Sequence, residues 1–280
     1  ANPTDTELFS KDRDLHTTFT AFGMTRRPGR STSNDPGLAA LLDAKADAIC
    51  FVAKTWDYHV RVALETTNEE NLASIRDSVK AAKDRGREVL VDCEHFFDGY
   101  KANPDYALSC AKAAYDSGAR WVVLCDTNGG TLPHEIEAIV GAVTKIIPGD
   151  HVGIHAHNDT EQAVANSLAA VRAGARQIQG TLNGIGERCG NANLVSIIPT
   201  LKLKKEFSDR FDIHISEDKL KALASASRKL DDMLNRVPNR HAPYVGDSAF
   251  ATKAGIHASA ILKDPATYER FERVIICHGV

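Results

Sequence analysis

The sequence predicts an α/β fold built from consecutive strand–helix units, and three observations predict it. Short apolar runs rich in β-forming residues recur along the chain, each is followed by a stretch with helical spacing, and glycine-bearing junctions of similar sequence lead into later strands. The apolar runs occupy residues 16–21, 48–53, 88–93, 120–125, 151–156 and 177–182. Runs that are apolar on both faces and alternate with helices are typical of a parallel sheet covered by helices.

The stretches between these runs carry apolar residues at the spacing of one helix face. The clearest stripe consists of Ile136, Ile139, Val140, Val143 and Ile147. Pro133 suits the first turn of this helix, and Pro148 with Gly149 suits its end. In the junctions at residues 116–120 and 172–176, a central glycine can adopt the left-handed conformation that ends a helix.

Six such units in succession favour a TIM (β/α)8 barrel over an open doubly wound sheet, because no GxGxxG motif follows the first strand. A complete barrel has eight strands, so we expect that this chain, which begins with Ala1, lacks the first two. After about residue 200 the alternation ends, and residues 217–235 predict a long amphipathic helix. The predicted organisation is a partial catalytic barrel over residues 1–205, followed by a small helical accessory or dimerisation region over residues 206–280.

Composition excludes several classes of protein. The 280 residues include 34 Lys and Arg against 37 Asp and Glu, a net charge of −3, and 43% are hydrophobic. This balance argues against a disordered chain, a collagen-like chain and a basic nucleic-acid binder. No apolar run approaches the ~18–20 residues of a membrane-spanning helix. We therefore expect no nucleic-acid or membrane partner. Six cysteines without a CxxC pair, and no signal peptide, predict reduced thiols in a cytoplasmic protein.

Two histidines at the end of the fifth predicted strand form the sharpest local signal. His155 and His157 are two residues apart, so on an extended strand both side chains project to the same face. Barrel folds build their active sites at the C-terminal ends of the strands, and two neutral imidazoles suit a divalent metal. Because two ligands are too few, such a site also needs a carboxylate or amide from another strand. The alternative is a pair of polar residues in a strand-to-helix loop.

A glycine-rich segment, residues 183–193, follows the last predicted strand. Its glycines let backbone amides approach a ligand, and the amides that open the following helix form an anion site, although a tight turn alone also explains the glycines. Together with the histidine pair, the whole stretch over residues 155–194 resembles the second signature of the 2-isopropylmalate, homocitrate and citramalate synthases. These enzymes are metal-dependent, Claisen-condensing TIM barrels of the DRE-TIM metallolyase superfamily.

The resemblance extends over nearly the whole chain, from TAFGMTRRPG near residue 20 to AGIHASAI near residue 255. The segments KTWDYHV, EHFFDGYKANPDYA and LCDTNGGT are most similar to the citramalate synthase branch. Glu161 supports this placement, because the general signature has glycine there and the branch commonly has glutamate.

The resemblance implies particular roles for residues at the strand ends. His155 and His157 would bind a divalent metal (manganese, magnesium or zinc), with Asn191 as a further ligand or support. Thr127 would bind the carboxylate of a 2-oxoacid, and Glu94 would be the base that acts on acetyl-CoA. Read without the resemblance, Glu94 is also explained as a solvated carboxylate at a strand end, and Thr127 as a turn cap.

The resemblance also implies roles outside the predicted barrel strands. Glu187 and Arg188 fall where the thioester arm of acetyl-CoA would pass, and His257 would enter the active site of a neighbouring subunit, which requires a homodimer. Without the resemblance, His257 is explained as a histidine near the start of a helix.

The implied activity is that of an acyltransferase that converts the acyl group into an alkyl group on transfer. It would join acetyl-CoA to pyruvate, giving citramalate and free CoA, in the biosynthesis of branched-chain amino acids, specifically isoleucine. The alternatives are a 2-isopropylmalate synthase acting on 2-oxoisovalerate for leucine, and a retro-aldol lyase of the hydroxymethylglutaryl-CoA type. A pocket that differs by a few methyl groups discriminates by only ~1–3 kcal/mol per methylene, so the acceptor stays open at this point.

One departure from the family pattern bears on activity. The first family signature, an Asp-x-x-Leu-Arg-Asp-Gly run that supplies a carboxylate ligand and an arginine, does not occur in these 280 residues. The absence of this run is consistent with the expectation that two of the eight barrel strands are missing from this chain. A third alternative is therefore a catalytically inactive, truncated barrel that serves as a binding or dimerisation module.

Overall fold

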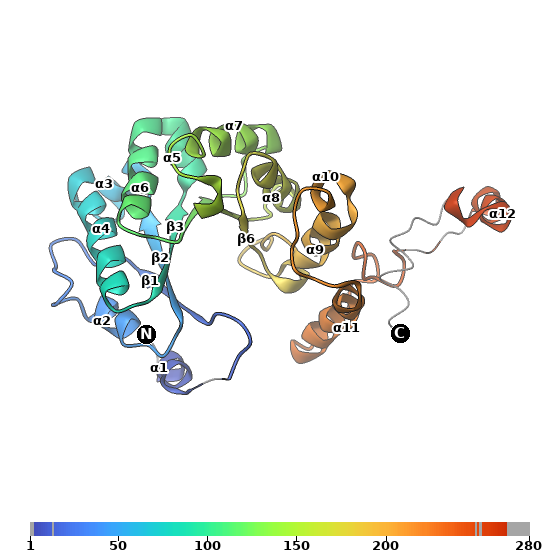
Figure 1. The fold of residues 1–280 in the computed structure, drawn as a ribbon, viewed down its shortest axis with the longest axis horizontal. Coiled ribbons are helices and arrows are strands. Elements are labelled where there is room, and N and C mark those ends of the chain that lie inside the picture. The colour runs from blue at the N-terminus through green and yellow to red at the C-terminus, as the bar shows by residue number, and fades with distance from the viewer. Residues whose placement is uncertain (1–2, 13, 250, 252–253, 268–280) are drawn as a thin grey trace. The chain divides into compact units, whose positions relative to one another are not determined.

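The computed structural model describes residues 3–12, 14–249, 251 and 254–267. The chain forms two compact units, Ala1–Gln179 and Gly180–Val280 (Figure 1). The first unit contains a six-stranded sheet, whereas the second is mainly helical.

All five pairings between strands of the sheet are parallel, and the strands lie in the order in which they occur along the chain. They are β1 (Thr20–Met24), β2 (Ala48–Lys54), β3 (Glu88–Glu94), β4 (Trp121–Asp126), β5 (Val152–Ala156) and β6 (Gln177–Gln179). A doubly wound sheet reverses its strand order at a switch point, and this sheet has no such reversal among its described strands. The α/β class and the parallel sheet are as predicted, and the order fits an arc of a barrel.

A contact across the sheet shows that it is strongly curved. Gln179 Nε2 on β6 donates a hydrogen bond of 2.8 Å to Asp92 Oδ1 on β3. In a flat sheet these two strands, three positions apart, would be separated by roughly 14 Å, too far for the two side chains to meet. The strands therefore curl around a common interior, and both side chains point into it.

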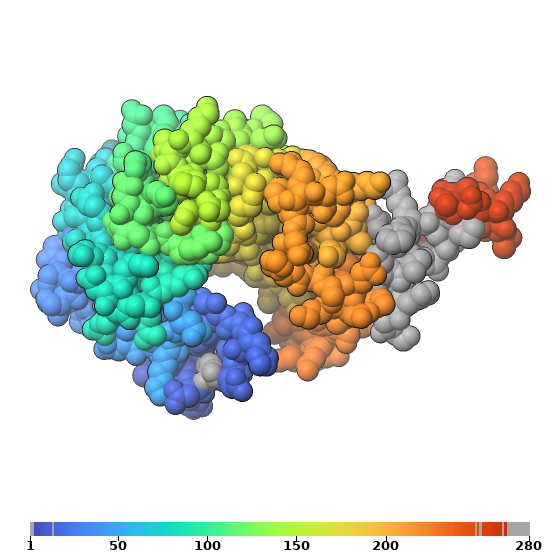
Figure 2. Space-filling model, viewed as in Figure 1, coloured from blue at the N-terminus to red at the C-terminus, as the bar shows by residue number. Residues whose placement is uncertain are grey.

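Helices connect successive strands of the first unit and pack against the sheet (Figure 1). They are α2 (Pro36–Leu42), α3 (Asp57–Val62), α4 (Asn68–Asp84), α5 (Phe96–Ala102), α6 (Pro104–Asp116), α7 (Pro133–Val143) and α8 (Ala163–Arg172), whereas α1 (Pro3–Ser10) precedes β1. In the space-filling view, α4, α6 and α7 form part of an unbroken outer surface (Figure 2). The predicted apolar stripe of α7 is buried, and Ile147, just beyond the helix, is buried as well. Burial of such stripes provides most of the apolar core.

The first and last strands differ in length or position from the prediction. The first run was predicted over residues 16–21, but β1 begins at Thr20. The parallel pairing with β2 begins only there, because the carboxylate of Asp47 accepts the N–H of Phe19 and the carbonyl of Phe19 accepts the N–H of Asp47. The last run was predicted over residues 177–182, but β6 ends at Gln179, before the turn that Thr181 opens.

Asp35 fixes the beginning of α2 and the loop before it. Its carboxylate accepts hydrogen bonds from the backbone N–H groups of Arg27 (2.6 Å), Gly37 (2.9 Å) and Leu38 (3.2 Å). Burial alone would raise the pKa of this carboxyl, but the three N–H groups and nearby Arg27 hold the pKa below its ordinary value of 3.8. An N-cap aspartate with three donors stabilises the fold as a charged group.

We expect Asp35→Ala to lower the free energy of unfolding by about 1–2 kcal/mol at pH 7, measured by urea denaturation. Because the pKa is lower in the folded state, this stabilisation is present above pH 3.8 and is lost as the pH falls through the folded-state pKa. The exposed Asp43, which ends the same helix, is the matched control, and its alanine variant should lose less. Equal losses of unfolding free energy in the two variants would contradict the role of Asp35 as a stabilising N-cap.

The second unit is organised around one long helix. Its elements are the 3-10 turn η2 (Leu182–Gly184), α9 (Leu194–Leu203), α10 (Lys205–Ser208), α11 (Glu217–Met233), α12 (Gly255–Lys263) and the 3-10 turn η3 (Pro265–Thr267). The helix predicted over residues 217–235 is α11, which is capped by Ser216 and buries Leu220 and Leu223 against Val195 of α9 and Val245. Ser227, the polar interruption of the predicted stripe, is also buried, because its hydroxyl donates to Asn183 Oδ1 (2.6 Å).

The described part of the chain contains free cysteines and no helix that could cross a membrane. Cys50, Cys93, Cys110, Cys125 and Cys189 are free thiols, and Cys277 lies outside the described residues. Across residues 3–12, 14–249, 251 and 254–267, the helices are all too short or too polar to cross a membrane.

Candidate active site

The two predicted histidines lie at the C-terminal end of β5. His155 belongs to the strand and His157 follows directly after it. Their ring centroids are 5.1 Å apart, with the ring planes inclined by 40°, so the two imidazoles lie side by side. His157 is only 9% exposed. The alternation of an extended strand explains the arrangement, since positions i and i+2 share a face.

The register of the sheet brings one residue from each strand between β2 and β6 to the same level. Each residue of this level is the register partner of the next one. The step from β3 to β4 follows because Cys93 and Leu124, each one residue before the level, are partners. In strand order the level residues are Lys54, Glu94, Cys125, His155 and Gln179. We call this set the polar level. It brings an ammonium group, a carboxylate, a thiol, an imidazole and an amide to one height near the C-terminal ends of the strands.

Glu94 is held by its neighbour on β2. Its Oε2 forms an ion pair with Lys54 Nζ, and the two side chains are 24% and 19% exposed. The carbonyl oxygen of Glu94 accepts a hydrogen bond from Thr55 Oγ1 (2.7 Å), which ties the two strand ends together. Glu94 is therefore a fixed, partly accessible carboxylate rather than a freely solvated one, as a general base requires.

Thr127 lies against the turn that follows Glu94. Its Oγ1 accepts a hydrogen bond of 2.8 Å from the backbone N–H of His95, whose φ of 54° is left-handed. The His95 ring bonds to Asp98 (3.2 Å), and Asn128 Nδ2 donates to the same carboxylate (2.9 Å). These bonds hold the pKa of Asp98 below its usual range, with the His95 bond as the largest cause. Thr127 thus joins the β4 loop to the β3 loop, in addition to any contact with substrate.

His59, near the start of α3, adds a second imidazole beside this turn. Its ring centroid lies 4.3 Å from that of His95 and 5.0 Å from the ring of Trp56. Burial lowers the pKa of His59, and the neighbouring His95 and Lys54 lower it further. A neutral imidazole beside Lys54 adds no second positive charge next to the Glu94 carboxylate.

In the second unit, Asn191 is buried within the glycine-rich turn. Its backbone N–H donates to the carbonyl of Gly184 (3.1 Å), and its side chain packs so closely on Gly186 that a Cβ at that position would overlap Asn191 Oδ1. Gly186 is thus needed for close packing. This agrees both with a tight turn and with a loop that binds a ligand. Asn191 is 9% exposed.

The other predicted residues of the second unit are more accessible. Glu187 and Arg188 are exposed side chains of the same turn, 3.7 Å apart between charged atoms, and Arg188 has a left-handed φ of 51°. His257 is half-buried on α12, whose described residues include no buried one. Glu187 and Arg188 therefore lie together in the turn, whereas His257 belongs to a separate helix of the unit.

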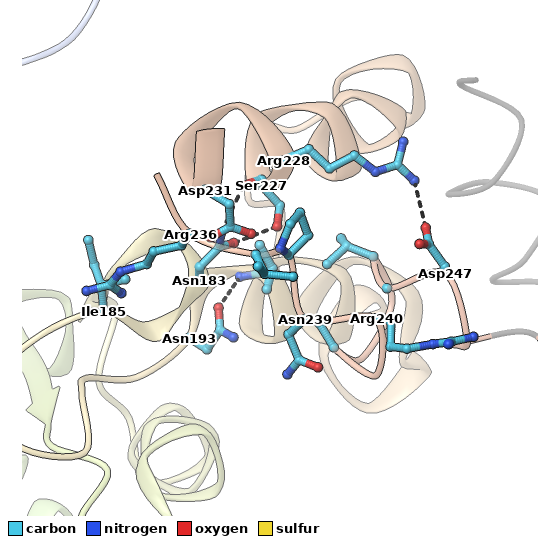
Figure 3. Close-up of a pocket in the computed structure, with 16 residues that line it drawn as sticks. Asn183, Ile185, Asn193, Ser227, Arg228, Asp231, Arg236, Asn239, Arg240 and Asp247 are labelled. Atoms are coloured by element: carbon cyan, nitrogen blue, oxygen red, sulfur yellow. Dashed lines mark hydrogen bonds and ion pairs between the residues drawn. The ribbon is translucent and has the colours of Figure 1, made fainter. Parts of the chain in front are cut away.

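The second unit also contains a pocket of about 610 Å³ beside α11 (Figure 3). At one end, Asn183 Nδ2 donates to the carbonyl of Ser227 (2.9 Å) and to Asp231 Oδ1 (3.0 Å). At the other end, Arg228 pairs with Asp247 (3.3 Å). Asn183, Ile185 and Asn193 of the glycine-rich segment line this pocket, but Glu187, Arg188 and Asn191 are not among its lining residues.

The donor set of the first unit fits a cation with two imidazole ligands. In the part of the chain that the structure describes, no group of three or more His, Cys, Asp or Glu side chains gathers to hold a metal. The remaining coordination positions would therefore fall to an amide, to water or to substrate oxygens, which divalent cations such as Mg²⁺ and Mn²⁺ accept readily.

The structure brings two groups of predicted residues together in the first unit: His155 with His157, and Glu94 with the loop of Thr127. Sequence reasoning did not single out Lys54 or Gln179. Lys54 directly follows the run predicted over residues 48–53, so its position at a strand end was a usable signal. Gln179 gave no such signal, because only the register and curvature of the sheet place it beside His155.

Comparison with protein families matches residues 19–228 to the HMGL-like family and residues 244–275 to the homocitrate synthase post-HMGL domain-like family. Among curated proteins, an (R)-citramalate synthase of Aquifex aeolicus is 51% identical over 279 residues, which cover 99% of this chain and 52% of that protein. One of Streptomyces coelicolor is 48% identical over 280 residues, covering 99% and 51%. A probable 2-isopropylmalate synthase of Methanopyrus kandleri is 36% identical over 230 residues, covering 82% and 44%.

Solved structures with a similar fold include two lyases. The hydroxymethylglutaryl-CoA lyase of Bacillus subtilis has a TM-score of 0.68 at 19% identity, covering 85% of this chain and 78% of that one. The lyase of Pseudomonas aeruginosa has a TM-score of 0.65 at 19% identity, covering 84% and 76%. At this identity the similarity concerns the fold alone.

The chain spans about half the length of the curated relatives that it matches. The HMGL-like match nevertheless covers most of the chain, including both histidines of β5 and all of the polar level. The resemblance found in the sequence is confirmed at this level: the chain belongs to the HMGL-like family.

Proposed function

We propose that this chain is the catalytic part of an (R)-citramalate synthase, which joins acetyl-CoA to pyruvate and releases CoA. The observation that carries the proposal is the identity of 41–51% to five curated (R)-citramalate synthases over 96–99% of the chain. The matching 2-isopropylmalate and homocitrate synthases are 35–36% identical over 82–86% of it. The pair of imidazoles and the fixed carboxylate supply chemistry that such a condensation needs.

His155 and His157 would hold the divalent cation (manganese, magnesium or zinc), and Thr127 would bind the carboxylate of the 2-oxoacid. When bound, the cation acts as a Lewis acid that polarises the keto group and offsets the negative charge that develops on its oxygen. The chain's own residues orient the acceptor beside the β3 turn, where Thr127 already bonds to the His95 backbone.

Glu94 would remove a proton from the methyl group of acetyl-CoA. The resulting carbanion attacks the keto carbon of pyruvate, forming the new carbon–carbon bond, and water then cleaves the thioester to release CoA. The ammonium of Lys54 keeps the Glu94 carboxylate in one place before the proton is taken, and its positive charge partly balances the carboxylate.

The roles of the second unit follow from the resemblance. We infer that Asn191 completes or supports the cation site, that Glu187 and Arg188 line the path of the thioester arm, and that His257 serves the active site of a second subunit in a homodimer. The enzyme would be cytoplasmic and belong to isoleucine biosynthesis. The free, mostly buried thiols agree with a reducing compartment.

We also infer that the sheet is part of an eight-stranded barrel with two further strands between β6 and β1. The curvature supports this, as do the exposed apolar side chains of Phe22 (62%) and Met24 (50%) on the edge strand β1. An exposed apolar edge strand is otherwise a site of aggregation. The division into a barrel over residues 1–205 and a helical accessory region over residues 206–280 stays a prediction.

The test of the proposed function is the release of free thiol from acetyl-CoA by the full-length protein with Mn²⁺ and a 2-oxoacid. We expect kcat/KM to be higher for pyruvate than for 2-oxoisovalerate, with (R)-citramalate as the product on chiral chromatography. Preference for 2-oxoisovalerate would instead identify a 2-isopropylmalate synthase, and cleavage of hydroxymethylglutaryl-CoA would identify a lyase. A protein that dimerises but neither binds cation nor releases thiol would be an inactive module.

A mixing experiment checks the cross-subunit histidine. We expect His257→Ala and Glu94→Ala enzymes, each nearly inactive alone, to regain up to about a quarter of wild-type activity when refolded together, because a statistical half of the dimers are mixed and each has one intact site. Native mass spectrometry verifies that mixed dimers form. If they form without any gain in activity, His257 does not act across the interface.

A further inference from the structure

Three side chains of the barrel interior form a short chain of hydrogen bonds behind the histidine pair. His155 Nδ1 lies 2.7 Å from Gln179 Oε1, and Gln179 Nε2 donates to Asp92 Oδ1 at 2.8 Å. The three residues come from β5, β6 and β3, and Asp92 is only 6% exposed. Neither Gln179 nor Asp92 has a role in the chemistry proposed above.

The chemistry of the three groups fixes the direction of both bonds. Burial raises the pKa of Asp92, whereas Cys50, His155 and Gln179 favour its charged form. With Asp92 ionised, its carboxylate only accepts hydrogen bonds, so it accepts from the amide nitrogen of Gln179, and the amide oxygen faces His155. That oxygen also only accepts, so the hydrogen between the two side chains must be on Nδ1 of His155. In a neutral imidazole with its proton on Nδ1, the lone pair is on Nε2.

We propose that Gln179 is a positioning residue of the cation site, which holds His155 in the tautomer that offers Nε2 as the ligand atom. Asp92 acts one step further back, because it sets the orientation of the Gln179 amide. This inference rests on the proposed function, since it assumes that His155 binds the cation. Partners of this kind orient metal-binding histidines, and their loss typically lowers metal affinity 10–100-fold.

The chain offers a matched control on the same strand. Gln177 is two residues before Gln179 and faces the same side of β6. It is in register with Gly153, and its Oε1 is buried without a hydrogen-bond partner among the described residues. Gln177→Leu therefore removes the same amide from the same interior without touching the three-residue chain.

The experiment compares the tautomer of His155 in metal-free, full-length protein labelled with 15N-histidine. Two-bond 15N–1H correlations distinguish the two tautomers, and the His155→Gln variant identifies the His155 signal. We expect the Nδ1–H form in the wild type and in Gln177→Leu, and a mixture with the Nε2–H form in Gln179→Leu. Calorimetric titration with Mn²⁺ should show a 10–100-fold weaker affinity for Gln179→Leu alone.

A second variant covers the case in which Gln179→Leu does not fold. Asp92→Asn keeps the size of the side chain, but its amide can donate as well as accept, so the Gln179 amide is free to turn over. We expect mixed tautomers of His155 in this variant as well. An unchanged Nδ1–H signal and unchanged Mn²⁺ affinity in either folded variant would overturn the inference. If His155→Ala still binds Mn²⁺ with wild-type affinity, the cation site itself is wrong, which is a different failure.

Discussion

Glu94→Gln should lower kcat for the condensation of acetyl-CoA with pyruvate by about 10²–10⁴-fold, because an amide cannot take the proton of the methyl group. The substitution keeps the size of the side chain, and Lys54 is partly exposed, so its ammonium can bind water instead. We therefore expect the fold and the affinity for the 2-oxoacid to be retained. Initial rates of thiol release, with circular dichroism and pyruvate titration on the same preparation, check all three points.

Glu88→Gln is the control for this prediction. Glu88 begins the same strand and is exposed at the opposite end of the sheet, so its substitution should leave kcat within about twofold of wild type. A parallel check is exchange of the acetyl-CoA methyl protons for deuterium, which should stop in Glu94→Gln if proton removal is the affected step. Continued exchange at the wild-type rate would assign the base to another group.

His155→Ala should remove one of the two imidazoles that the described residues offer to a cation. A Lewis acid contributes several kcal/mol at the transition state, so we expect turnover to fall on the order of 10²–10³-fold and Mn²⁺ binding to be lost. Because the side chain is only half-buried, the fold should persist. Calorimetric titration with Mn²⁺ and thiol-release kinetics across a range of Mn²⁺ concentrations measure both effects.

The matched control is His151→Ala. His151 directly precedes β5 at its other end, where its ring bonds to the carbonyl of Arg120 (2.9 Å) and packs edge-on against Tyr115. This substitution should affect stability but not Mn²⁺ affinity. If His155→Ala turns over at the wild-type rate with one equivalent of Mn²⁺ bound, the assignment of His155 as a ligand is incorrect.

Local periodicity was sufficient to predict most of the fold. The alternation of apolar runs and helical stripes located five of the six strands to within about three residues at each end, and α11 to within two residues. The strand period also predicted that His155 and His157 share a face, because that depends only on a spacing of two. What placed β1 four residues later was the contact of Phe19 with Asp47, 28 residues away, which no local pattern contains.

Spatial relations between distant strands could not be predicted in this way. The ion pair of Lys54 with Glu94 depends on the register of β2 against β3, and a slip of one residue would turn one side chain to the other face. The bond from Gln179 to Asp92 depends on how far the sheet curls. Neither register nor curvature can be read from the sequence of a single strand, so these two contacts became visible only in three dimensions.

The polar level has a consequence for any attempt to change which keto acid the enzyme accepts. Its ammonium pairs with its carboxylate and its imidazole bonds to its amide, so exchanging one member of a pair removes the contact that holds the other in place. Libraries of variants that aim to accept larger or smaller keto acids should therefore leave the polar level unchanged. Variation belongs in the strand-to-helix loops above it, where contours can change while the reactive groups keep their places.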